Sequence, residues 1–252
     1  MRPVTNDTGD ITYEVKPGVF KRICKRAEAD PDNQYALVID EINRGNISKI
    51  FGELISLVEV DKRKGSRNEL TVTLPYSDLP FTVPSNLDII GTMNTADRSL
   101  THIDIALRRR FTFEELRTDY SLLSDNISGI NVKRMVYAIN QRIELLLDRE
   151  HILGHAYLMN ASSIEDLELS FKTNIMPLLE EYFFEDWEKI SQVFNHNPFI
   201  TENEEAQSIW LGTKDEYSPK SFRVNIASLK NIEAYQDIYS SIEDSAFAEC
   251  EQ

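Results

Sequence analysis

The stretch Tyr-Ala-Leu-Val-Ile-Asp-Glu, residues 35–41, decides the fold class of this chain of 252 residues. An uninterrupted apolar run from Tyr35 to Ile39 is followed directly by two acids, Asp40 and Glu41. A short continuous run of this kind is typical of a strand that is buried on both faces of a parallel sheet. Ligands bind at the carboxyl ends of such strands, so both acids stand where chemistry is expected. Taken alone the pattern is common, and its weight depends on the segments around it.

The segments around this strand predict an α/β layer. Apolar spacing and turn residues indicate helices at 19–29 and 47–58, a β-hairpin from about 70 to 83, a strand at 87–92, a helix at 100–110 and a strand at 111–113. Asn46 is placed to cap the second helix. Strands that alternate with helices favour a parallel sheet.

The remainder of the chain has a different character. Helical spacing predicts helices at 132–147, at 164–184 with an interruption at Pro177, and at 187–194, and residues 221–226 fit an edge strand. Residues 1–118 carry 17 basic and 18 acidic side chains, whereas residues 119–252 carry 10 and 24, so that almost all of the net charge of −15 lies in the second part. We expect three parts: an α/β part at 1–118, a helical part at 119–194 and an acidic C-terminal extension at 195–252.

Composition excludes some classes of protein. A net charge of −15 argues against a free-standing nucleic-acid-binding module. No apolar run approaches the ~18–20 residues that cross a bilayer. The two cysteines, Cys24 and Cys250, have no metal-ligand or redox spacing, and the four histidines have no zinc spacing, so a reducing, cytoplasmic location is expected.

In nucleotide-hydrolysing proteins the first acid of such a pair can hold Mg²⁺ through water and the second can polarise the attacking water. Two further polar motifs fit this interpretation. The strand at 87–92 leads into Met-Asn-Thr-Ala-Asp-Arg-Ser, residues 93–99, where an amide at a strand end could orient an attacking water. Residues 106–111 read Ala-Leu-Arg-Arg-Arg-Phe, and arginine suits the developing charge of a phosphate because it is planar, always charged and bidentate. A solvated basic face, or ion pairs to Glu114 and Glu115, would explain the same arginines.

The order and spacing of the runs 40–46, 93–99 and 106–111 closely resemble the McrB family of AAA+ GTPase subunits of modification-dependent restriction systems. The resemblance covers about residues 18–157, and Met-Asn-Thr-Ala-Asp is its most specific mark. Residues 153–157, Leu-Gly-His-Ala-Tyr, look like the Gly-His-Ser-Tyr stretch of the family's helical lid, with Ala156 in place of serine. The implied fold is a partial AAA+ P-loop NTPase core followed by an α-helical lid.

The resemblance also implies roles for single residues. Asp40 is the Walker B acid that holds Mg²⁺ through water, Glu41 is the catalytic base, and Asn94 is the sensor-1 amide. Asp97, Arg98 and His155 belong to the nucleotide site. Arg109 and Arg110 are the arginine fingers that act on a neighbouring subunit, and Arg108 is the less certain third.

For the assembly, the resemblance implies a ring, expected to be a hexamer, that binds GTP between subunits, works with an McrC-like nuclease and reaches DNA through the complex. The hairpin at 70–83 would face the pore. Beside it, Lys62, Arg63, Lys64 and Arg67 form a basic turn, which is either a solvated loop or a contact to DNA phosphates. An ATP-using AAA+ protein of the MoxR or dynein-related kind is the alternative.

The family's phosphate-binding loop, Gly-x-x-x-x-Gly-Lys-Ser/Thr, is not found in this sequence, because none of its nine glycines is followed by lysine. We therefore expect an N-terminally truncated McrB-like chain, which lacks the Walker A strand and does not bind nucleotide tightly alone. A gap in its sheet is also expected. Two other readings stay open: a non-catalytic ring subunit that donates Arg109 or Arg110 to a neighbour, and a non-functional remnant.

Overall fold

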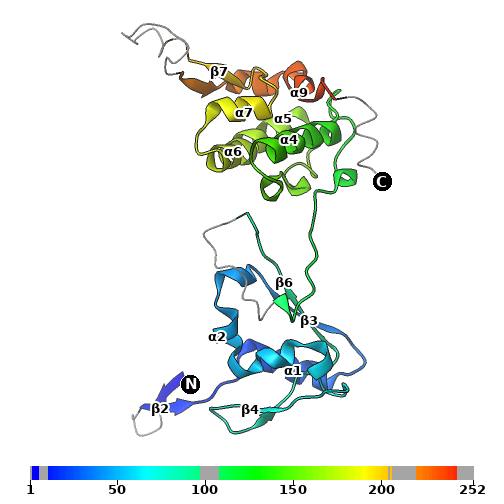
Figure 1. Cartoon of the computed structure of the whole chain (residues 1–252), viewed down its shortest axis with the longest axis vertical. Coiled ribbons are helices and arrows are strands. Elements are labelled where there is room, and N and C mark those ends of the chain that lie inside the picture. Colours follow the sequence, from blue (N-terminus) through cyan, green and yellow to red (C-terminus); the bar gives the residue numbers. More distant parts are fainter. Residues whose placement is uncertain (1, 6–10, 97–107, 204, 206–219, 243–252) are drawn as a thin grey trace. The chain divides into compact units, whose positions relative to one another are not determined.

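A computed structural model describes residues 2–5, 11–96, 108–203, 205 and 220–242. The chain divides into two compact units, residues 1–114 and 115–252 (Figure 1). Among the described residues, no helix is long and apolar enough to cross a membrane.

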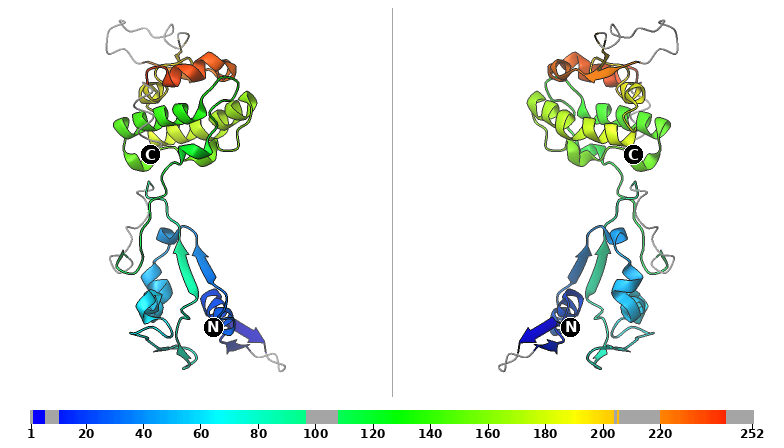
Figure 2. Two further views of the ribbon diagram at one scale, coloured as in Figure 1. Left: turned by 90° about the vertical axis from the view of Figure 1, so that its right-hand side faces the viewer. Right: turned by 90° about the vertical axis from the view of Figure 1, so that its left-hand side faces the viewer.

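The centre of unit 1 is a parallel pair of strands. The strands β3 (Tyr35–Ile39) and β6 (Leu87–Gly91) pair in parallel, with Tyr35 opposite Leu87 and Ile39 opposite Gly91 (Figure 2). The sequence predicted both strands and their parallel direction, and the structure confirms these predictions. Because the strands run in parallel, the residues that follow them, Asp40 and Thr92, emerge at the same edge.

Only one face of this pair is covered. Helix α1 (Val19–Ala29), predicted at these bounds, contributes the buried Cys24 and Ala27 to a core that includes Leu87. On the other face, Val38 is 61% exposed and Ile90 is 49% exposed. The expectation of a strand buried on both faces is therefore wrong for this structure, because the described cover lies on one side of a two-stranded sheet.

The helix predicted at 47–58 is shorter than expected. Helix α2 (Ile47–Phe51) begins as predicted, since the side chain of Asn46 accepts a hydrogen bond from the Lys49 amide at 2.8 Å. It ends at Gly52, whose φ of +51° is a conformation that glycine adopts without a steric penalty. The chain continues as a 3-10 helix over Gly52–Val58, which still buries Leu57 and Val58.

Two hairpins flank this layer. The predicted hairpin is present but short, with β4 (Val72–Thr73) antiparallel to β5 (Pro80–Phe81). A second hairpin, β1 (Arg2–Thr5) with β2 (Ile11–Glu14), was not predicted because residues 1–18 have little periodicity. The strand predicted at 111–113 is wrong: these residues are not in a strand, and Phe111 packs beside the buried Ile42 instead. Most of the helix predicted at 100–110 lies outside the described residues.

Unit 2 is a helical body around one apolar core. Its elements are α4 (Val132–Leu146), α5 (Ile164–Ser170), α6 (Met176–Tyr182), α7 (Trp187–Val193) and α9 (Ile232–Tyr239), together with β7 (Ile200–Glu202) and β8 (Phe222–Val224). α4 begins where Asn131 caps it, as its amphipathic spacing predicted. The edge strand expected at 221–226 is present as β8, which pairs antiparallel with β7.

The interruption predicted at Pro177 takes the form of a π-helical turn. Residues Phe171–Ile175 form π-type bonds between α5 and α6, and Pro177 lies in the first turn of α6. A proline has no amide hydrogen to donate within a helix, and a widened turn before it accommodates the missing bond. The chain therefore stays helical through this region.

Residues 195–242, expected to begin an acidic extension, belong to this core where they are described. Tyr235 and Ile238 of α9 are fully buried with Phe171 and Phe199. The ring of Phe171 meets the rings of Tyr235 and Phe199 edge to face, at centroid distances of 5.2 and 5.6 Å. These contacts make α9 an integral element of unit 2.

Candidate functional site

The carboxyl ends of β3 and β6 form a hydrogen-bonded cluster. The Thr92 hydroxyl donates to the Asp40 carboxylate. The oxygen of that hydroxyl, Thr92 Oγ1, accepts a hydrogen bond from the Glu41 amide at 3.2 Å. The backbone joins in, because the Thr92 amide donates to the Ile39 carbonyl and the Ile42 amide donates to the Thr92 carbonyl. Thr92 thus holds both predicted acids against the end of the neighbouring strand.

The backbone at Gly91 lies close to the side chain of Ile42, which follows the two acids. A Cβ atom at Gly91 would lie 2.8 Å from the Cδ1 atom of Ile42, which is less than a carbon contact allows. Ile42 is buried, and it packs here with Ile39 and Ile89. A larger residue at position 91 would therefore force the Ile42 side chain to shift.

Glu41 stands on an unusual backbone. Its φ of +49° is in the left-handed region, which costs a non-glycine residue about 1–3 kcal/mol. Its carboxylate pairs with the Arg44 guanidinium at 2.5 Å, and the two side chains are 49% and 56% exposed. An exposed pair of this kind contributes little to stability, so the carboxylate is available to a ligand.

The predicted sensor residue Asn94 lies in the loop after β6. Asn43 donates from its side-chain amide to the Asn94 carbonyl at 3.2 Å, which ties the loop after β3 to the loop after β6. The Asn94 side chain accepts the Ala96 amide at 3.0 Å. Asp40, Glu41 and Asn94 are therefore brought to one edge, and Thr92 and Asn43, to which no role was assigned from the sequence, make the connection.

This edge could hold a hard cation. Asp40 is exposed, and its oxygens are the ligand type that Mg²⁺ prefers. In the part of the chain that the structure describes, no cluster of three or more His, Cys, Asp or Glu side chains could hold a metal ion. Mg²⁺ is commonly bound through one or two carboxylates, waters and substrate phosphates, and Asp40 supplies one such carboxylate.

The three arginines differ in their surroundings. Arg110 pairs with Glu59, with Nε 2.8 Å from Oε1, and the two side chains are 20% and 30% exposed. The Arg108 guanidinium lies over the ring of Phe113, 5.9 Å from its centroid. Arg109 is exposed and has no hydrogen bond or ion pair within the described residues. The predicted site residues Asp97 and Arg98 lie outside the described residues.

His155 belongs to unit 2. It opens a 3-10 helix over His155–Tyr157, and its Nδ1 accepts the Asp119 amide at 3.0 Å. Hydrogen bonds from Ser121 hold the pKa of the Asp119 carboxyl below its ordinary value. His155 thus lies in a different unit from the strand-end cluster, and its role at a nucleotide stays a prediction.

The basic turn beside the hairpin is largely structural. Arg63 is buried, and its guanidinium donates to the carbonyls of Leu87 and Val58. Lys64 pairs with Glu28. A turn that presents all four cations to DNA is therefore ruled out, because Arg63 faces the core, and Arg67 is the exposed cation for which no interaction is found in the described chain.

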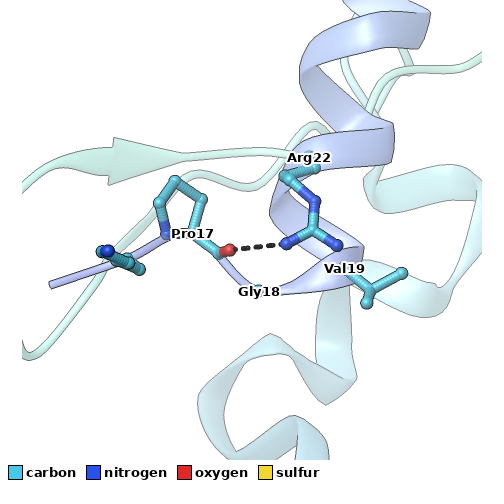
Figure 3. A pocket seen from close by; sticks show the side chains of 5 residues that line it. Pro17, Gly18, Val19 and Arg22 are labelled. Atoms are coloured by element: carbon cyan, nitrogen blue, oxygen red, sulfur yellow. Dashed lines mark hydrogen bonds between the residues drawn. The ribbon is translucent and has the colours of Figure 1, made fainter. Parts of the chain in front are cut away.

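A pocket of about 230 Å³ lies at the beginning of α1 (Figure 3). Its lining includes Gly18, Val19 and Arg22, and the Arg22 guanidinium donates to the Pro17 carbonyl at 3.1 Å. No residue of the strand-end cluster lines it. The chemistry predicted from the sequence is therefore at an open strand edge and not in this pocket.

Comparisons with known families define the class. Residues 5–111 match the family model of the AAA domain, dynein-related subfamily, and residues 131–191 match that of the McrB alpha-helical lid domain. The first match includes the strand-end cluster, and the second includes α4 to α6 and most of α7. The chain is therefore an AAA-domain protein with a helical lid.

Two curated proteins narrow this class. The chain is 37% identical over 198 residues to the type IV methyl-directed restriction enzyme EcoKMcrB subunit of Escherichia coli (strain K12), which covers 70% of this chain and 42% of that protein. It is 28% identical over 212 residues to the type II restriction enzyme BsuMI component YdiS of Bacillus subtilis (strain 168), covering 75% and 58%. The chain belongs to the McrB-like AAA proteins, and it spans about half the length of these relatives.

Proposed function

We propose that this chain is a nucleotide-hydrolysing AAA component of a methyl-directed restriction system, with GTP as its nucleotide. The observation that carries the proposal is the cluster at the ends of β3 and β6, where Thr92 joins Asp40 to Glu41 and Asn43 ties Asn94 to them. This is the arrangement of a cation-holding acid, a base and a water-orienting amide at one sheet edge.

Each residue of the cluster has a separate task. Asp40 holds Mg²⁺ through water, and its hydrogen bond from Thr92 fixes the carboxylate. Glu41 takes a proton from the attacking water, for which it exchanges its ion pair with Arg44. Asn94 orients the same water. When bound, Mg²⁺ neutralises charge that develops on the phosphate oxygens.

Arginine acts across the subunit boundary in this proposal. Arg109 is the preferred finger because it is exposed without a partner in the described structure, whereas Arg110 is engaged by Glu59. Asp97 and Arg98 complete the nucleotide signature, and His155 contributes from the lid. A finger supplied by a neighbour is worth ~10³–10⁵ in rate. This requires a ring, for which we propose a hexamer that acts on DNA with an McrC-like nuclease.

We propose that the phosphates are held mainly by groups outside the 252 residues of this sequence. No glycine of the sequence is followed by lysine, so the β- and γ-phosphates lack the usual loop and its lysine. The exposed guanidinium of Arg109 supports a second candidate function: a subunit that acts only by donating Arg109 to a neighbour's site. ATP in place of GTP is the alternative nucleotide, and the match to a dynein-related AAA family supports it.

Hydrolysis assays on the purified chain, alone and mixed with an McrB-like protein that carries a P-loop, separate these functions. If the chain completes its own site in the mixture, Glu41→Gln and Arg109→Ala both lower Mg²⁺-dependent GTP turnover. If it acts only as a donor, Arg109→Ala lowers the turnover and Glu41→Gln leaves it unchanged.

The matched controls are Glu53→Gln and Arg117→Ala, which change exposed side chains outside the cluster. Faster hydrolysis of ATP than of GTP would make the GTP assignment wrong. Turnover that is the same with and without the chain, and with each variant, would contradict both functions.

A further inference from the structure

The side-chain amide of Asn140 binds both the backbone amide and the backbone carbonyl of Leu153, in a loop of unit 2. Asn140 is on α4 and is only 2% exposed. Its Oδ1 accepts the Leu153 amide at 2.7 Å, and its Nδ2 donates to the Leu153 carbonyl at 3.0 Å. Nδ2 also donates to the Tyr120 hydroxyl at 3.2 Å. The side chain is thus fully used in binding residues outside its own helix.

This orientation of the amide is the one that the backbone permits. If Oδ1 and Nδ2 were exchanged, oxygen would face the Leu153 carbonyl and nitrogen would face its amide hydrogen. Both contacts would be repulsive, and a buried amide without partners is costly. A second donor supports the loop, since the Thr118 hydroxyl donates to the same Leu153 carbonyl at 2.7 Å.

Two residues further along, the loop presents His155. The Asp119 amide, next to Thr118, donates to Nδ1 of His155 at 3.0 Å. The His155 carbonyl accepts the amides of Leu158 and Met159, which fixes the backbone on its other side. Thr118, which donates to the Leu153 carbonyl, and Asp119, which binds the imidazole, are therefore neighbours in the chain, and Tyr120 beside them accepts from Asn140.

The bond from Asp119 decides where the imidazole carries its proton. A backbone amide only donates, so Nδ1 has to be the unprotonated nitrogen and the neutral ring carries its hydrogen on Nε2. The side chain is half-buried, and Nε2 has no hydrogen-bond partner within the described residues. The ring thus holds one free N–H donor in a fixed position.

We propose that Asn140 is a positioning residue that fixes His155 as an Nε2–H donor, and that this donor binds a hydrogen-bond acceptor of the nucleotide. The second part rests on the proposed function, whereas the first does not. The acceptor is an oxygen of a phosphate or an acceptor atom of the base, because a neutral N–H group serves either.

Nitrogen NMR of the full chain, labelled at histidine and without nucleotide, tests the positioning. In the spectrum of the neutral ring, we expect the Nδ1 of His155 at the shift of an unprotonated nitrogen and its Nε2 at that of a protonated one. His155→Gln assigns the signals. In Asn140→Leu we expect the Nδ1 and Nε2 shifts to move toward each other, because exchange between the two tautomers averages them.

The matched control is Asn197→Leu. Asn197 is also in unit 2, is 3% exposed, and clamps backbone in the same way, by accepting from the Phe199 amide and donating to the Ala234 carbonyl. Its loss should destabilise the unit comparably and leave the His155 tautomer unchanged. If Asn140→Leu does not fold, Thr118→Val removes one anchor of Leu153 and should give a smaller shift in the same direction. A His155 tautomer that is the same in wild type, Asn140→Leu and Thr118→Val would overturn the positioning role.

Titration of a uniformly nitrogen-labelled chain with GTP, ATP, guanosine and inorganic triphosphate tests the donor role. A change at His155 Nε2 with guanosine indicates the base, and a change with triphosphate indicates the phosphates. Shifts near Asp40 without any at His155 would make the donor role wrong. No shift anywhere would contradict nucleotide binding by this chain and with it the donor role, whereas the positioning is decided by the ligand-free spectra.

Discussion

Replacing Arg63 with methionine should raise the population of molecules in which the core of unit 1 is opened to solvent. The guanidinium donates to the carbonyls of Leu87 and Val58, residues that are 0% and 3% exposed. Methionine fills similar space but donates nothing, so both carbonyls lose their partner. Burial lowers the pKa of Arg63 from its ordinary value, and the charge of Asp88 opposes that shift.

The magnitude follows from two opposing terms. Each carbonyl left without a donor costs about 1–3 kcal/mol. Relief from burying a cation offsets part of this, because a desolvated charge is itself unfavourable. We expect a net loss of about 2 kcal/mol in the free energy of opening, which corresponds to about a 30-fold change in the population of the open form.

Labelling of Cys24 measures that population. Cys24 is 3% exposed in the same core, and burial raises its pKa to about 12, so its thiol reacts only when the core opens. Cys250 is the other cysteine of the sequence, and Cys250→Ser in every variant removes its signal. Arg63→Met should then label about 30-fold faster than the parent chain.

Two further variants sharpen this test. Arg63→Lys retains one donor and should fall between the parent and Arg63→Met. Lys64→Met removes the neighbouring exposed cation, whose ion pair with Glu28 is worth little, and should label at the parent rate. Equal rates for Arg63→Met and Lys64→Met would refute the assignment of Arg63 to the core.

Three predictions concern unit 2. Phe184→Gly should raise its stability by about 0.5 kcal/mol in urea unfolding followed by Trp187 fluorescence, because Phe184 is 90% exposed at a φ of +53°; a destabilised variant would mean that its ring makes a contact that matters. Phe171→Ala should cost about 3–5 kcal/mol, since its fully buried ring is part of the aromatic core, and a loss below 1 kcal/mol would contradict this. Hydrogen bonds from Ser162 and Ser163 hold the pKa of Asp166 below its ordinary 3.8, so its charge stabilises the fold above that pH and the benefit is lost as pH falls through the lowered pKa. The advantage of the parent chain over Asp166→Asn in thermal unfolding should therefore shrink below pH 3.8, and an advantage independent of pH would exclude the charge as its cause.

The elements with regular spacing were predictable from the sequence. The continuous apolar run of β3, the short apolar stretch of β6 and the period of α1 and α4 predicted the right elements at nearly the right bounds. The break at Gly52 was missed because the apolar period continues through it, and the period reports which face is buried but not how the backbone turns. The open face of the sheet was missed for a related reason, since composition does not show which neighbours are present.

The candidate site was predictable in its residues and not in its contacts. Asp40, Glu41 and Asn94 were marked by their places at strand ends, a signal that depends on sequence alone. The ion pairs of Glu41 with Arg44 and of Arg110 with Glu59 depend on side-chain positions, which no spacing rule gives. The second of these contacts is what separates Arg109 from Arg110 as a finger.

The remaining contacts that the sequence did not predict have a common origin: they are made by polar side chains that bind irregular backbone. Asn86 donates to the carbonyls of Ala27, Asp30 and Asn33, and so fixes the turn between α1 and β3. Asn140 and Arg63 do the same for the loop before His155 and for the start of β6. In a hydrophobic pattern such residues count as solvent-exposed, yet Asn140 and Arg63 are buried and bind backbone that is distant in sequence. The loop that carries His155 is therefore positioned by a side chain that a periodic pattern assigns to the surface, and Asn86 and Arg63 act at the ends of β3 and β6 opposite to the strand-end cluster.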